Sequence, residues 1–555
     1  MGDPAMREKR FLLGVYLLAL AVRLVYIADI RDNPFFEHPV LDEDIHHQWA
    51  SRLARGEPWM PGEPFFRAPL YPYFLSLLFR IAGAGFTAPR VLQALLTSAT
   101  PVLLYLLGRA LLPRTCAATA SLLLAVYAML FYFDTGFLIE AIFIPLVLLS
   151  LLLLAEATSP GESRGDRRRI WFAAGLALGL SAIARPNVLL FLLVLPAWIF
   201  RAAKPGTARR AAAALLLGAA LPIAPVFLHN AATGDPVLIA WQGGINFYIG
   251  NNPESDGMTA IAPGTEGTWW GGYRDMIRIA EESAGRTLRR SDVSDYWTGR
   301  AIAFLREEPG RAAALFAKKA YLVFNDFEVS NNQGIYFFRR FSGVFSAFAR
   351  FGFGLLFPLA AAGAVLIRWD RRRALLPLFL ATYAGSIVLF FVTARFRMPL
   401  VPVLMLPAAT ALGGWSAALR KTWDRRRTVS VAVFASALLF SNSNLYGLDR
   451  NENAQGHFNV GAVLLSEQRF REAIPHFLEA LERKPKYVNA RYNLGLCHSY
   501  LGELEEARGA FETLLAEHPE HAPARRALDS VLRREAELRR GPEGAQDPRP
   551  APGSP

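Results

Sequence analysis

Runs of apolar residues long enough to cross a lipid bilayer recur along most of this 555-residue chain. Runs of about 16 to 25 mostly apolar residues are long enough to cross the hydrocarbon core as helices, and about eleven stretches qualify. They lie near 11–29, 88–112, 115–133, 136–156, 170–184, 187–202, 211–229, 346–367, 374–393, 398–418 and 428–442. With 53% hydrophobic and 19% charged residues, the chain is too apolar for a soluble protein. The sequence therefore predicts an all-α polytopic membrane protein with a transmembrane helical bundle.

The basic residues between these runs predict the orientation of the bundle. The first run follows Arg7, Lys9 and Arg10 and lacks a cleavage site of small residues, so we expect an uncleaved first span. Four basic clusters then fall on the cytoplasmic side if the N-terminus is inside. They are Arg164 with Arg167, Arg168 and Arg169; Arg201 with Lys204, Arg209 and Arg210; Arg368 with Arg371, Arg372 and Arg373; and Arg420 with Lys421, Arg425, Arg426 and Arg427. The formal net charge of +13 thus indicates membrane loops rather than a nucleic-acid partner.

This topology places three polar regions outside: residues 30–87, residues 231–345 and everything after 443. In the first, Arg67-Ala68-Pro69 opens an aromatic-rich amphipathic stretch that reaches Phe79. In the second, residues 241–253 are rich in turn formers, and helical patterns follow at 292–308 and 310–323. This long loop is either a lid that faces a substrate or a packed extracytoplasmic subdomain.

The C-terminal region changes to a soluble, helical composition with a repeat at a fixed offset of 34 residues. The matching positions are Gly461 and Gly495, Ala473 and Ala507, Phe477 and Phe511, and Pro485 and Pro519. This spacing resembles two tetratricopeptide (TPR) repeats, whose paired helices cross at small residues. We expect a capping helix near 522–540. The predicted domains are 1–445 for the membrane part, 453–540 for the helical repeats and 541–555 for a disordered tail rich in Pro and Gly.

No nucleotide-binding loop, zinc-protease motif or nucleophile elbow occurs, and two cysteines do not make a disulfide framework. Arginines at the outer ends of spans are more informative, because the positive-inside tendency does not explain them. They are Arg67, Arg185, Arg395 and Arg397. The planar guanidinium suits a phosphate held at headgroup depth. The alternative for each is snorkelling to ordinary lipid headgroups.

Carboxylates gather on the same predicted face. Asp42, Glu43 and Asp44 follow the first span, and Asp134 and Glu140 flank the start of the fourth. A carboxylate beside a reacting hydroxyl can act as a general base, and two can hold a divalent cation. Together with the arginines, these acids indicate glycosyl transfer from a lipid phosphate. The alternative for the first three acids is a solvated loop.

Two histidines, His46 and His47, follow the three acids directly. They are candidate metal ligands, although histidines on a helix surface are commoner. The cofactor requirement stays open, with a divalent metal ion as the one candidate.

The ordered set of these motifs resembles the GT-C glycosyltransferases. More narrowly, it is similar to bacterial relatives of the dolichyl-phosphate-mannose protein mannosyltransferases and of the lipid A aminoarabinose transferases. The resemblance covers roughly residues 8–440. The motifs that carry it are Leu41-Asp42-Glu43-Asp44, Phe66-Arg67-Ala68-Pro69-Leu70-Tyr71-Pro72, Glu140, Arg185-Pro186-Asn187 and Arg395-Phe396-Arg397-Met398-Pro399.

The resemblance implies an inverting transferase that takes a monosaccharide from a polyprenyl-phosphate donor. It implies that Asp42 and Glu43 form the acidic pair important for catalysis. The arginines would bind the donor phosphate, and Asp44, Asp134 and Glu140 would support them. His46 departs from the pattern, because an aromatic residue usually follows the acidic pair there.

The leading hypothesis is therefore a multi-pass glycosyltransferase of a bacterial inner membrane, with its active site and TPR repeats on the extracytoplasmic side. Its expected partners are the lipid-linked donor, a protein, lipid or glycan acceptor, and a protein bound by the repeats. A transporter or flippase is one rival, but its charges usually lie at the membrane midplane rather than at one face. A membrane-anchored scaffold is the other, and one or two spans would suffice for it. The sequence does not identify the sugar, the polyprenol or the acceptor.

Overall fold

The computed structural model describes residues 3–160, 167–204, 206–265, 269–330, 334–418, 423–450, 454–519 and 521–540. Every regular element in these ranges is a helix. The predicted disordered tail at 541–555, and Arg164, Arg420 and Lys421 of the basic clusters, lie outside them. The all-α fold class predicted from the sequence is confirmed.

The chain forms two compact units. Unit 1 comprises residues 1–32, 39–335 and 339–448, and unit 2 comprises residues 33–38, 336–338 and 449–555. The division near 448 lies close to the end of the last predicted span. Two short segments that precede the repeats in the chain, 33–38 and 336–338, thus belong to the repeat unit.

Unit 1 contains most of the helices. In chain order they are α1 (Pro4–Asp29), α2 (Asp42–Ala54), α3 (Leu70–Ala82), α4 (Thr87–Thr97), α5 (Thr100–Leu111), α6 (Arg114–Ala125), α7 (Ala128–Thr135), α8 (Glu140–Ala157), α9 (Arg168–Ala184), η1 (Pro186–Val188), α10 (Leu189–Ala202), α11 (Ala208–Ala232), α12 (Gly243–Gly250), α13 (Trp269–Ala284), α14 (Arg290–Glu307), α15 (Pro309–Phe324), η2 (Arg339–Phe341), α17 (Gly343–Phe348), α18 (Phe353–Leu366), α19 (Leu375–Leu389), α20 (Ala394–Arg397), α21 (Leu400–Ala418) and α22 (Arg425–Asn442). The four-residue α16 (Ile335–Phe338) crosses from unit 1 into unit 2.

Membrane-length helices are fewer than the predicted spans. Among the described residues, six helical stretches are long and apolar enough to cross a bilayer, or seven if the bent pair α6 and α7 forms one span. Three shorter apolar stretches, 70–82, 186–202 and 375–389, fall below the length criterion. The chain is a multi-pass membrane protein, and the count of about eleven spans stays a prediction. Some predicted runs correspond to helices that are too short, such as α19, which has 15 residues and ends at Leu389.

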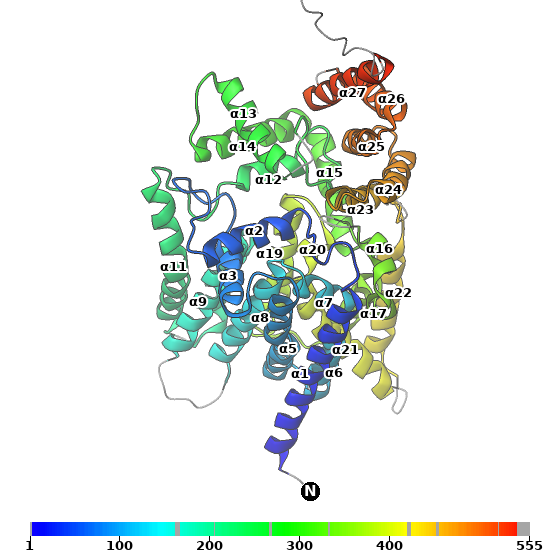
Figure 1. The fold of residues 1–555 in the computed structure, drawn as a ribbon. Helices are drawn as coiled ribbons and strands as arrows, with labels where there is room; N and C mark the ends of the chain where they lie inside the picture. Colours follow the sequence, from blue (N-terminus) through cyan, green and yellow to red (C-terminus); the bar gives the residue numbers. More distant parts are fainter. Residues whose placement is uncertain are drawn as a thin grey trace, which may run out of the picture. The chain divides into compact units, whose positions relative to one another are not determined.

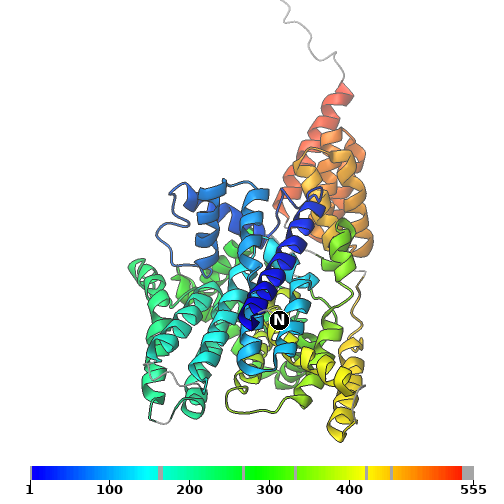
Figure 2. The same ribbon diagram turned by 90° about the horizontal axis from the view of Figure 1, so that it is seen from below.

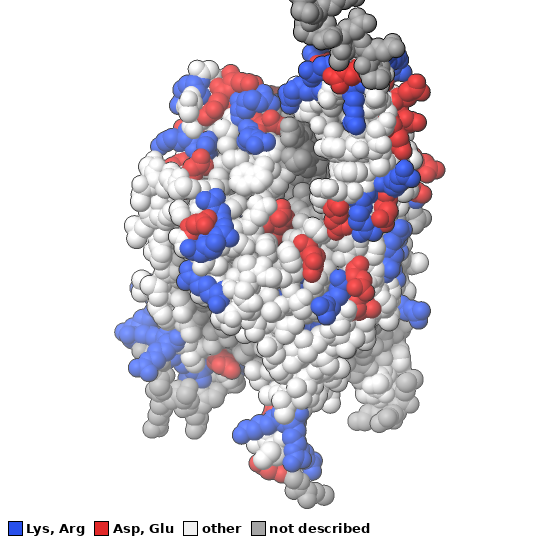
Figure 3. Space-filling model, viewed as in Figure 1, with Lys and Arg blue, Asp and Glu red and all other residues white. Residues whose placement is uncertain are grey.

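The elements of the two predicted outer regions gather at one end of unit 1. In Figure 1, α1 runs from the N-terminus at the lower end toward α2, and α12 to α15 lie at the upper end with α2. Both views place α9 and α11 on one side of the unit and α22 on the other (Figures 1 and 2). Uncharged side chains cover most of the middle of the visible face, and Lys and Arg surround the start of α1 (Figure 3). This distribution is typical of a helical bundle with an apolar belt.

Glycines let pairs of membrane helices pack with their backbones in contact. A Cβ on Gly175 of α9 would lie 1.9 Å from the carbonyl oxygen of Leu215 on α11, and one on Gly218 would lie 2.1 Å from that of Phe172. Gly363 of α18 approaches Pro407 of α21 in the same way, at 1.7 Å. Lipid tails are as apolar as leucine, so close packing of small residues is what holds such helices together.

The long loop after α11 is a packed subdomain. Its core contains Trp241, Tyr248, Tyr273, Met276 and Trp297, all buried. Helices α14 and α15 cover the two predicted helical patterns closely. The turn-rich segment 241–253 differs from expectation, because it contains the eight-residue α12. Gly244 permits this helix to contact α14, where a Cβ would lie 1.9 Å from the carbonyl oxygen of Ser294.

Unit 2 contains the repeats, as five helices: α23 (Ala454–Ser466), α24 (Phe470–Arg483), α25 (Val488–Leu501), α26 (Leu504–Glu517) and α27 (Ala522–Arg540). The offset of 34 residues corresponds to one helix pair. The ring of Phe477 occupies the space beside Gly461, where a Cβ would lie 2.8 Å from it, and Phe511 lies beside Gly495 at 2.6 Å. The expected capping helix is α27, which buries Ala524 and Val531 against α26.

Candidate active site

The acidic stretch after the first span forms the first turn of a helix. Asp42, Glu43 and Asp44 begin α2, and Leu41 before them adopts a positive φ of 52°. A helix N-terminus carries a partial positive charge, so carboxylates are favourable in its first turn. Asp42 is only 5% exposed. The alternative of a solvated loop is therefore wrong for Asp42.

Two arginines from distant parts of the chain pair with Asp42. Arg67 donates to Oδ1 of Asp42 through Nη1 at 2.5 Å, and Arg395 donates to Oδ2 through Nη2 at 2.7 Å. Arg67 lies in the segment between α2 and α3, and its guanidinium stacks over the ring of Trp269 at 5.4 Å. Arg395 lies on the short α20. Each oxygen of Asp42 thus accepts a charge-assisted hydrogen bond.

The pairing continues through Arg395 to a second carboxylate. Glu140, the first residue of α8, forms a close ion pair with Arg185, and its Oε1 lies 3.7 Å from Nε of Arg395. The ring of Phe396 lies 4.9 Å from the Arg185 guanidinium. Asp42, Arg67, Glu140, Arg185 and Arg395 therefore form one acid–arginine cluster. It holds three guanidiniums and two carboxylates, a formal excess of one positive charge.

Several polar atoms of this cluster have no hydrogen-bond partner in the described part of the chain. Arg395 is 5% exposed, yet its Nε and Nη1 donate to no acceptor. Nε of Arg67 and Oε2 of Glu140 are also buried and also have no hydrogen-bond partner. Buried guanidinium N–H groups almost always have acceptors, so unfilled ones need an explanation. Their number and charge suit an anionic ligand that brings its own oxygens.

The neighbouring charges act differently on the two carboxylates of the predicted acidic pair. Burial alone would raise the pKa of Asp42, but Arg67 and Arg395 outweigh it and hold that pKa well below its usual range. For Glu43, burial raises the pKa and is only partly offset by Arg90 and by the backbone N–H of Phe137. That N–H donates to Oε2 of Glu43 at 3.2 Å. Asp42 is therefore ionised at neutral pH while both arginines contact it.

The two histidines form hydrogen bonds with backbone carbonyls. Nδ1 of His46 donates to the carbonyl oxygen of Phe137 at 2.8 Å, and Nε2 of His47 donates to that of Ala84 at 3.0 Å. Burial lowers the pKa of His46 to about 4, so its imidazole is neutral. No group of three or more His, Cys, Asp or Glu side chains in the described ranges could hold a metal ion. Because both oxygens of Asp42 also accept from arginines, these residues do not fit a divalent cation at this position.

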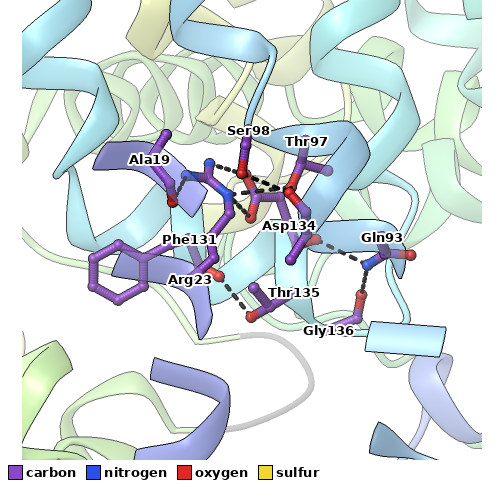
Figure 4. A network of polar contacts seen from close by, with 10 residues as sticks. Ala19, Arg23, Gln93, Thr97, Ser98, Phe131, Asp134, Thr135 and Gly136 are labelled. Carbon is purple, nitrogen blue, oxygen red and sulfur yellow. Dashed lines mark hydrogen bonds and ion pairs between the residues drawn. The ribbon is translucent and has the colours of Figure 1, made fainter. Parts of the chain in front are cut away.

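Asp134, a predicted supporting acid, lies in a separate buried network. Arg23, in the C-terminal half of α1, donates to both of its oxygens, at 3.1 Å and 2.5 Å, and to Thr97 at 3.1 Å (Figure 4). Gln93 donates to the carbonyl oxygens of Asp134 and Gly136, at 2.8 Å and 2.7 Å (Figure 4). This network supports the turn between α7 and α8, whose Phe137 contacts Glu43 and His46.

Breaking this buried pair from one side should destabilise the protein. Both side chains are at most 2% exposed, so Arg23→Met leaves an uncompensated carboxylate among apolar helices. We expect a cost of about 3–5 kcal/mol. Thermal unfolding of the purified protein, followed by tryptophan fluorescence, should show a lower midpoint. Arg23→Met combined with Asp134→Leu should recover most of the loss, and equal loss in the single and double variants would contradict the pairing.

Two further predicted site residues lie outside the acid–arginine cluster. Arg397 is almost fully buried, pairs with Glu328 at 2.6 Å and donates to the carbonyl oxygens of Asn325 and Phe327, at 2.5 Å and 3.2 Å. It thus connects α20 to the segment after α15. Asp44 accepts from Gln48 at 2.8 Å on the outer face of α2.

Two arginines near the site were not among the predicted residues. Arg23 and Arg90 are both buried, at 0% and 3% exposure. Arg90 lies 3.9 Å from Glu43 and over the ring of Phe137 at 4.3 Å. The available signal was a single arginine within or beside an apolar run, which is costly in a membrane and is therefore usually paired.

Two hollows lie beside α2, and Trp59 and Met60 line both of them. The larger holds about 500 Å³ and is lined mainly by His47, Gln48, Ser51, Arg52, Trp59 and Trp270. The smaller, with about 10 Å³, has room for one water molecule and lies beside Trp49, Glu63, Arg67 and Trp269. Residues 42, 45, 46 and 49 share one helical face, so the smaller hollow lies on the face of Asp42. The larger hollow has a volume typical of small-molecule sites.

Comparison with known families adds a finding independent of this geometry. Residues 66–241 match the model of the family described as dolichyl-phosphate-mannose-protein mannosyltransferase. Residues 464–530 match a tetratricopeptide repeat model. These two segments of the chain therefore resemble the mannosyltransferase family and the TPR proteins, respectively. The mannosyltransferase-like segment includes Arg67, Glu140 and Arg185, and the match supports the family resemblance recognised from the sequence.

Solved structures similar to this chain include an oligosaccharyltransferase and ArnT. Against the Archaeoglobus fulgidus oligosaccharyltransferase the TM-score is 0.44 with 14% identity, over 80% of this chain and 57% of the other. Against ArnT from Cupriavidus metallidurans, solved with undecaprenyl phosphate, it is 0.42 with 14% identity, over 90% and 80%. The tetratricopeptide repeat-containing protein trd-1 of Caenorhabditis elegans is 29% identical over 77 residues, which are 14% of this chain and 10% of trd-1. The chain thus spans only part of the oligosaccharyltransferase and of trd-1.

Proposed function

We propose that this chain transfers a monosaccharide from a polyprenyl-phosphate donor to an acceptor hydroxyl, with inversion at the anomeric carbon, on the extracytoplasmic face. The observation that carries the proposal is the acid–arginine cluster. It combines a carboxylate with guanidinium groups that have unfilled N–H donors, in a chain whose residues 66–241 match the mannosyltransferase family model.

The donor phosphate would bind the arginines of the cluster. Nε and Nη1 of Arg395 and Nε of Arg67 are the donors without an acceptor, and the cluster has a formal excess of one positive charge. Negative charge grows on the phosphate as the sugar–oxygen bond breaks, so fixed guanidiniums stabilise the transition state more than the ground state. Glu140 would hold Arg185 and Arg395 in place for this role.

Asp42 would act as the general base. In the acceptor step, the hydroxyl oxygen bonds to the anomeric carbon, the bond to the phosphate oxygen breaks, and the hydroxyl proton moves to Asp42. The polyprenyl phosphate leaves as an anion held by the arginines. A phosphate that competes for Arg67 and Arg395 withdraws hydrogen bonds from Asp42, so the pKa of Asp42 rises and it accepts a proton more readily.

Glu43 is the second candidate base from the sequence. Its hydrogen bond from Phe137 and its proximity to Arg90 favour a supporting role instead, in which it fixes the turn between α7 and α8 beneath α2. Asp44, Asp134 and Arg397 are assigned to positions around the site rather than to the reacting groups. Of the three acids that begin α2, this assignment leaves Asp42 as the one that pairs with phosphate-binding arginines.

The proposed location is a bacterial inner membrane, with the cluster on the periplasmic side. The common position of α2 and α12–α15 at one end of unit 1 supports a shared face for the outer loops (Figure 1). The repeats would bind an acceptor protein or an assembly partner, because TPR arrays present extended binding surfaces.

Removal of the repeats tests their part in the reaction. Deleting residues 453–555 should lower transfer to the natural acceptor by about tenfold, the effect of losing roughly 1.4 kcal/mol of binding free energy. Hydrolysis of the donor by water should stay within twofold, because it needs only the membrane unit. Transfer and hydrolysis rates measured on the same purified preparations check this. An equal fall in both would show that the repeats support folding instead.

Mass spectrometry of envelope lipids and glycoproteins, from cells with and without the gene, tests the function itself. We expect a mass difference of one sugar on one acceptor class, restored by the intact gene and not by Asp42→Asn. Purified protein in proteoliposomes that moves a labelled solute and transfers no sugar would instead establish the transporter alternative.

A further inference from the structure

A buried lysine joins the outer subdomain to the segment that carries Arg395. Lys319 of α15 is 0% exposed, and its Nζ donates to three oxygens. These are the carbonyl oxygen of Gly250 at 3.1 Å, Oδ1 of Asn251 at 2.9 Å and the carbonyl oxygen of Phe390 at 2.9 Å. An ammonium group has three N–H donors, so its hydrogen-bonding capacity is filled.

The acceptors lie at the C-terminal ends of two helices. Gly250 is the last residue of α12, and Phe390 directly follows α19. Helix C-termini present unpaired carbonyls and a partial negative charge, so a buried cation is favourable between them. The two ends also touch, since a Cβ on Gly250 would lie 2.0 Å from the carbonyl oxygen of Phe390. Asn251 adds a hydrogen bond to the carbonyl oxygen of Leu389 at 2.8 Å.

The segment beyond this junction leads directly to the acid–arginine cluster. The N–H of Val392 donates to the carbonyl oxygen of Gly257 at 2.9 Å, and that of Ala394 donates to the carbonyl oxygen of Val329 at 2.9 Å. Arg395 then follows and contacts Asp42. Residues 389–394 are thus fixed along the outer subdomain from Lys319 up to the proposed site.

We propose that Lys319 is a positioning residue, whose ammonium group fixes residues 389–394 and thereby directs the guanidinium of Arg395 toward Asp42 and the donor phosphate. This proposal rests on the proposed function for its effect on transfer. The fixing of the segment is a separate claim and can be measured without any activity.

A purely structural lysine would behave differently. Replacing a buried charge by an apolar side chain of similar size is often neutral or stabilising, because the cost of desolvating the charge disappears. A structural role therefore predicts unchanged alignment and transfer in Lys319→Met. The positioning role predicts a stable protein whose segment 389–394 is loose.

The pH dependence provides a second readout. Burial lowers the pKa of Lys319 to about 7. The titratable or charged groups on the elements that Lys319 contacts are Arg311, Lys318 and Tyr321 on α15, Tyr248 on α12, Glu254 and Asp256 after α12, Tyr383 on α19, and Arg395 beyond α19. A neutral amine has two N–H donors for three acceptors, so the segment should loosen as the pH rises through about 7.

Hydrogen–deuterium exchange on the purified full-length protein in nanodiscs tests the proposal. The reporters are the amides of Val392 and Ala394. In Lys319→Met we expect both to exchange about tenfold faster at pH 6, as local opening becomes less costly. In the wild type their protection should fall above pH 7, after correction for the intrinsic rate, and in Lys319→Met it should not change. The matched control is Lys318→Met, on the same helix, which should behave as wild type.

The same variants are then assayed for transfer. Lys319→Met should lower kcat/KM for the donor by about tenfold, mostly through KM, because Arg395 is no longer held for the phosphate. Lys319→Arg covers the case in which the methionine variant does not fold. It keeps the charge, but a planar fork cannot reach three converging oxygens, so the same faster exchange is expected.

Exchange at Val392 and Ala394 that matches wild type in a folded Lys319 variant would overturn the proposal. Faster exchange with unchanged donor kinetics would overturn the link to Arg395 as well. If the wild type transfers no sugar, the proposed function fails, and the exchange data still decide whether Lys319 fixes the segment.

Discussion

Asp42→Asn should reduce glycosyl transfer by about 10²- to 10⁴-fold, the contribution typical of a general base. Asparagine keeps the shape of the side chain and one acceptor oxygen, but it cannot take the acceptor proton. It also removes the negative charge that holds Arg67 and Arg395, so the phosphate-binding groups are freed rather than lost. We therefore expect the donor to bind at least as tightly while turnover collapses. Rates of transfer and donor affinity measured on purified protein separate the two effects.

The neighbouring acid offers a matched control. Asp44→Asn removes a carboxylate from the same helical turn, but Asp44 contacts only Gln48 among the hydrogen bonds described and lies on the opposite face of α2. Transfer by this variant should stay within a factor of two to three. If Asp44→Asn lost as much activity as Asp42→Asn, the proton acceptor would have to be reassigned.

Arg395→Gln should have the second large effect, about 10²- to 10³-fold on kcat/KM for the donor. That size is typical when one donor to a developing negative charge is removed. Arg395 is the one member of the cluster that contacts both Asp42 and Glu140. Arg395→Lys should recover little, since an ammonium on a flexible chain cannot replace a fork with two free N–H groups. Donor binding measured by calorimetry and single-turnover transfer check the prediction.

Arg278→Gln is a suitable control for the loss of an arginine from the same end of the protein. Its side chain is 54% exposed and pairs only with Asp275 and Glu282 on α13 among the contacts described. Transfer should be unaffected. If Arg278→Gln lost as much transfer activity as Arg395→Gln, surface charge in general would affect donor recruitment. That result would contradict a specific role for Arg395.

The sequence was sufficient for the repeats because their packing is local. A glycine 16 residues before a phenylalanine fixes the crossing of two consecutive helices, and the structure has Gly461 beside Phe477 and Gly495 beside Phe511. The membrane part was harder. Apolar runs indicate spans but not where a helix bends or stops, as between Ala125 and Ala128 or after Leu389. The positions of those breaks depend on how the helices pack against one another, and a hydropathy profile carries no information about that packing.

For the candidate site, the sequence predicted which residues take part and that they lie on one side of the membrane. It did not predict which acid pairs with which arginine. Placing Asp42, Arg67, Glu140, Arg185 and Arg395 on one face required only the topology. Nothing in the spacing distinguished Arg395 from Arg397, two residues apart, yet one contacts Asp42 and the other Glu328. Successive residues of one helical turn point about 100° apart, so α20 directs them to different partners. The partner of Asp134 was missed because Arg23 lies inside what reads as an ordinary first span.

The separation of Asp42 and Arg395 by 353 residues has a consequence for biosynthesis. Asp42 and Arg67 emerge early during translation, whereas Arg395 follows only after most of the hydrophobic segments have left the ribosome. A chain inserted up to α19 therefore lacks one of the two arginines that pair with Asp42 and one of the three proposed to bind the phosphate. On the proposed function, insertion of α20 is the step at which the nascent protein should acquire activity.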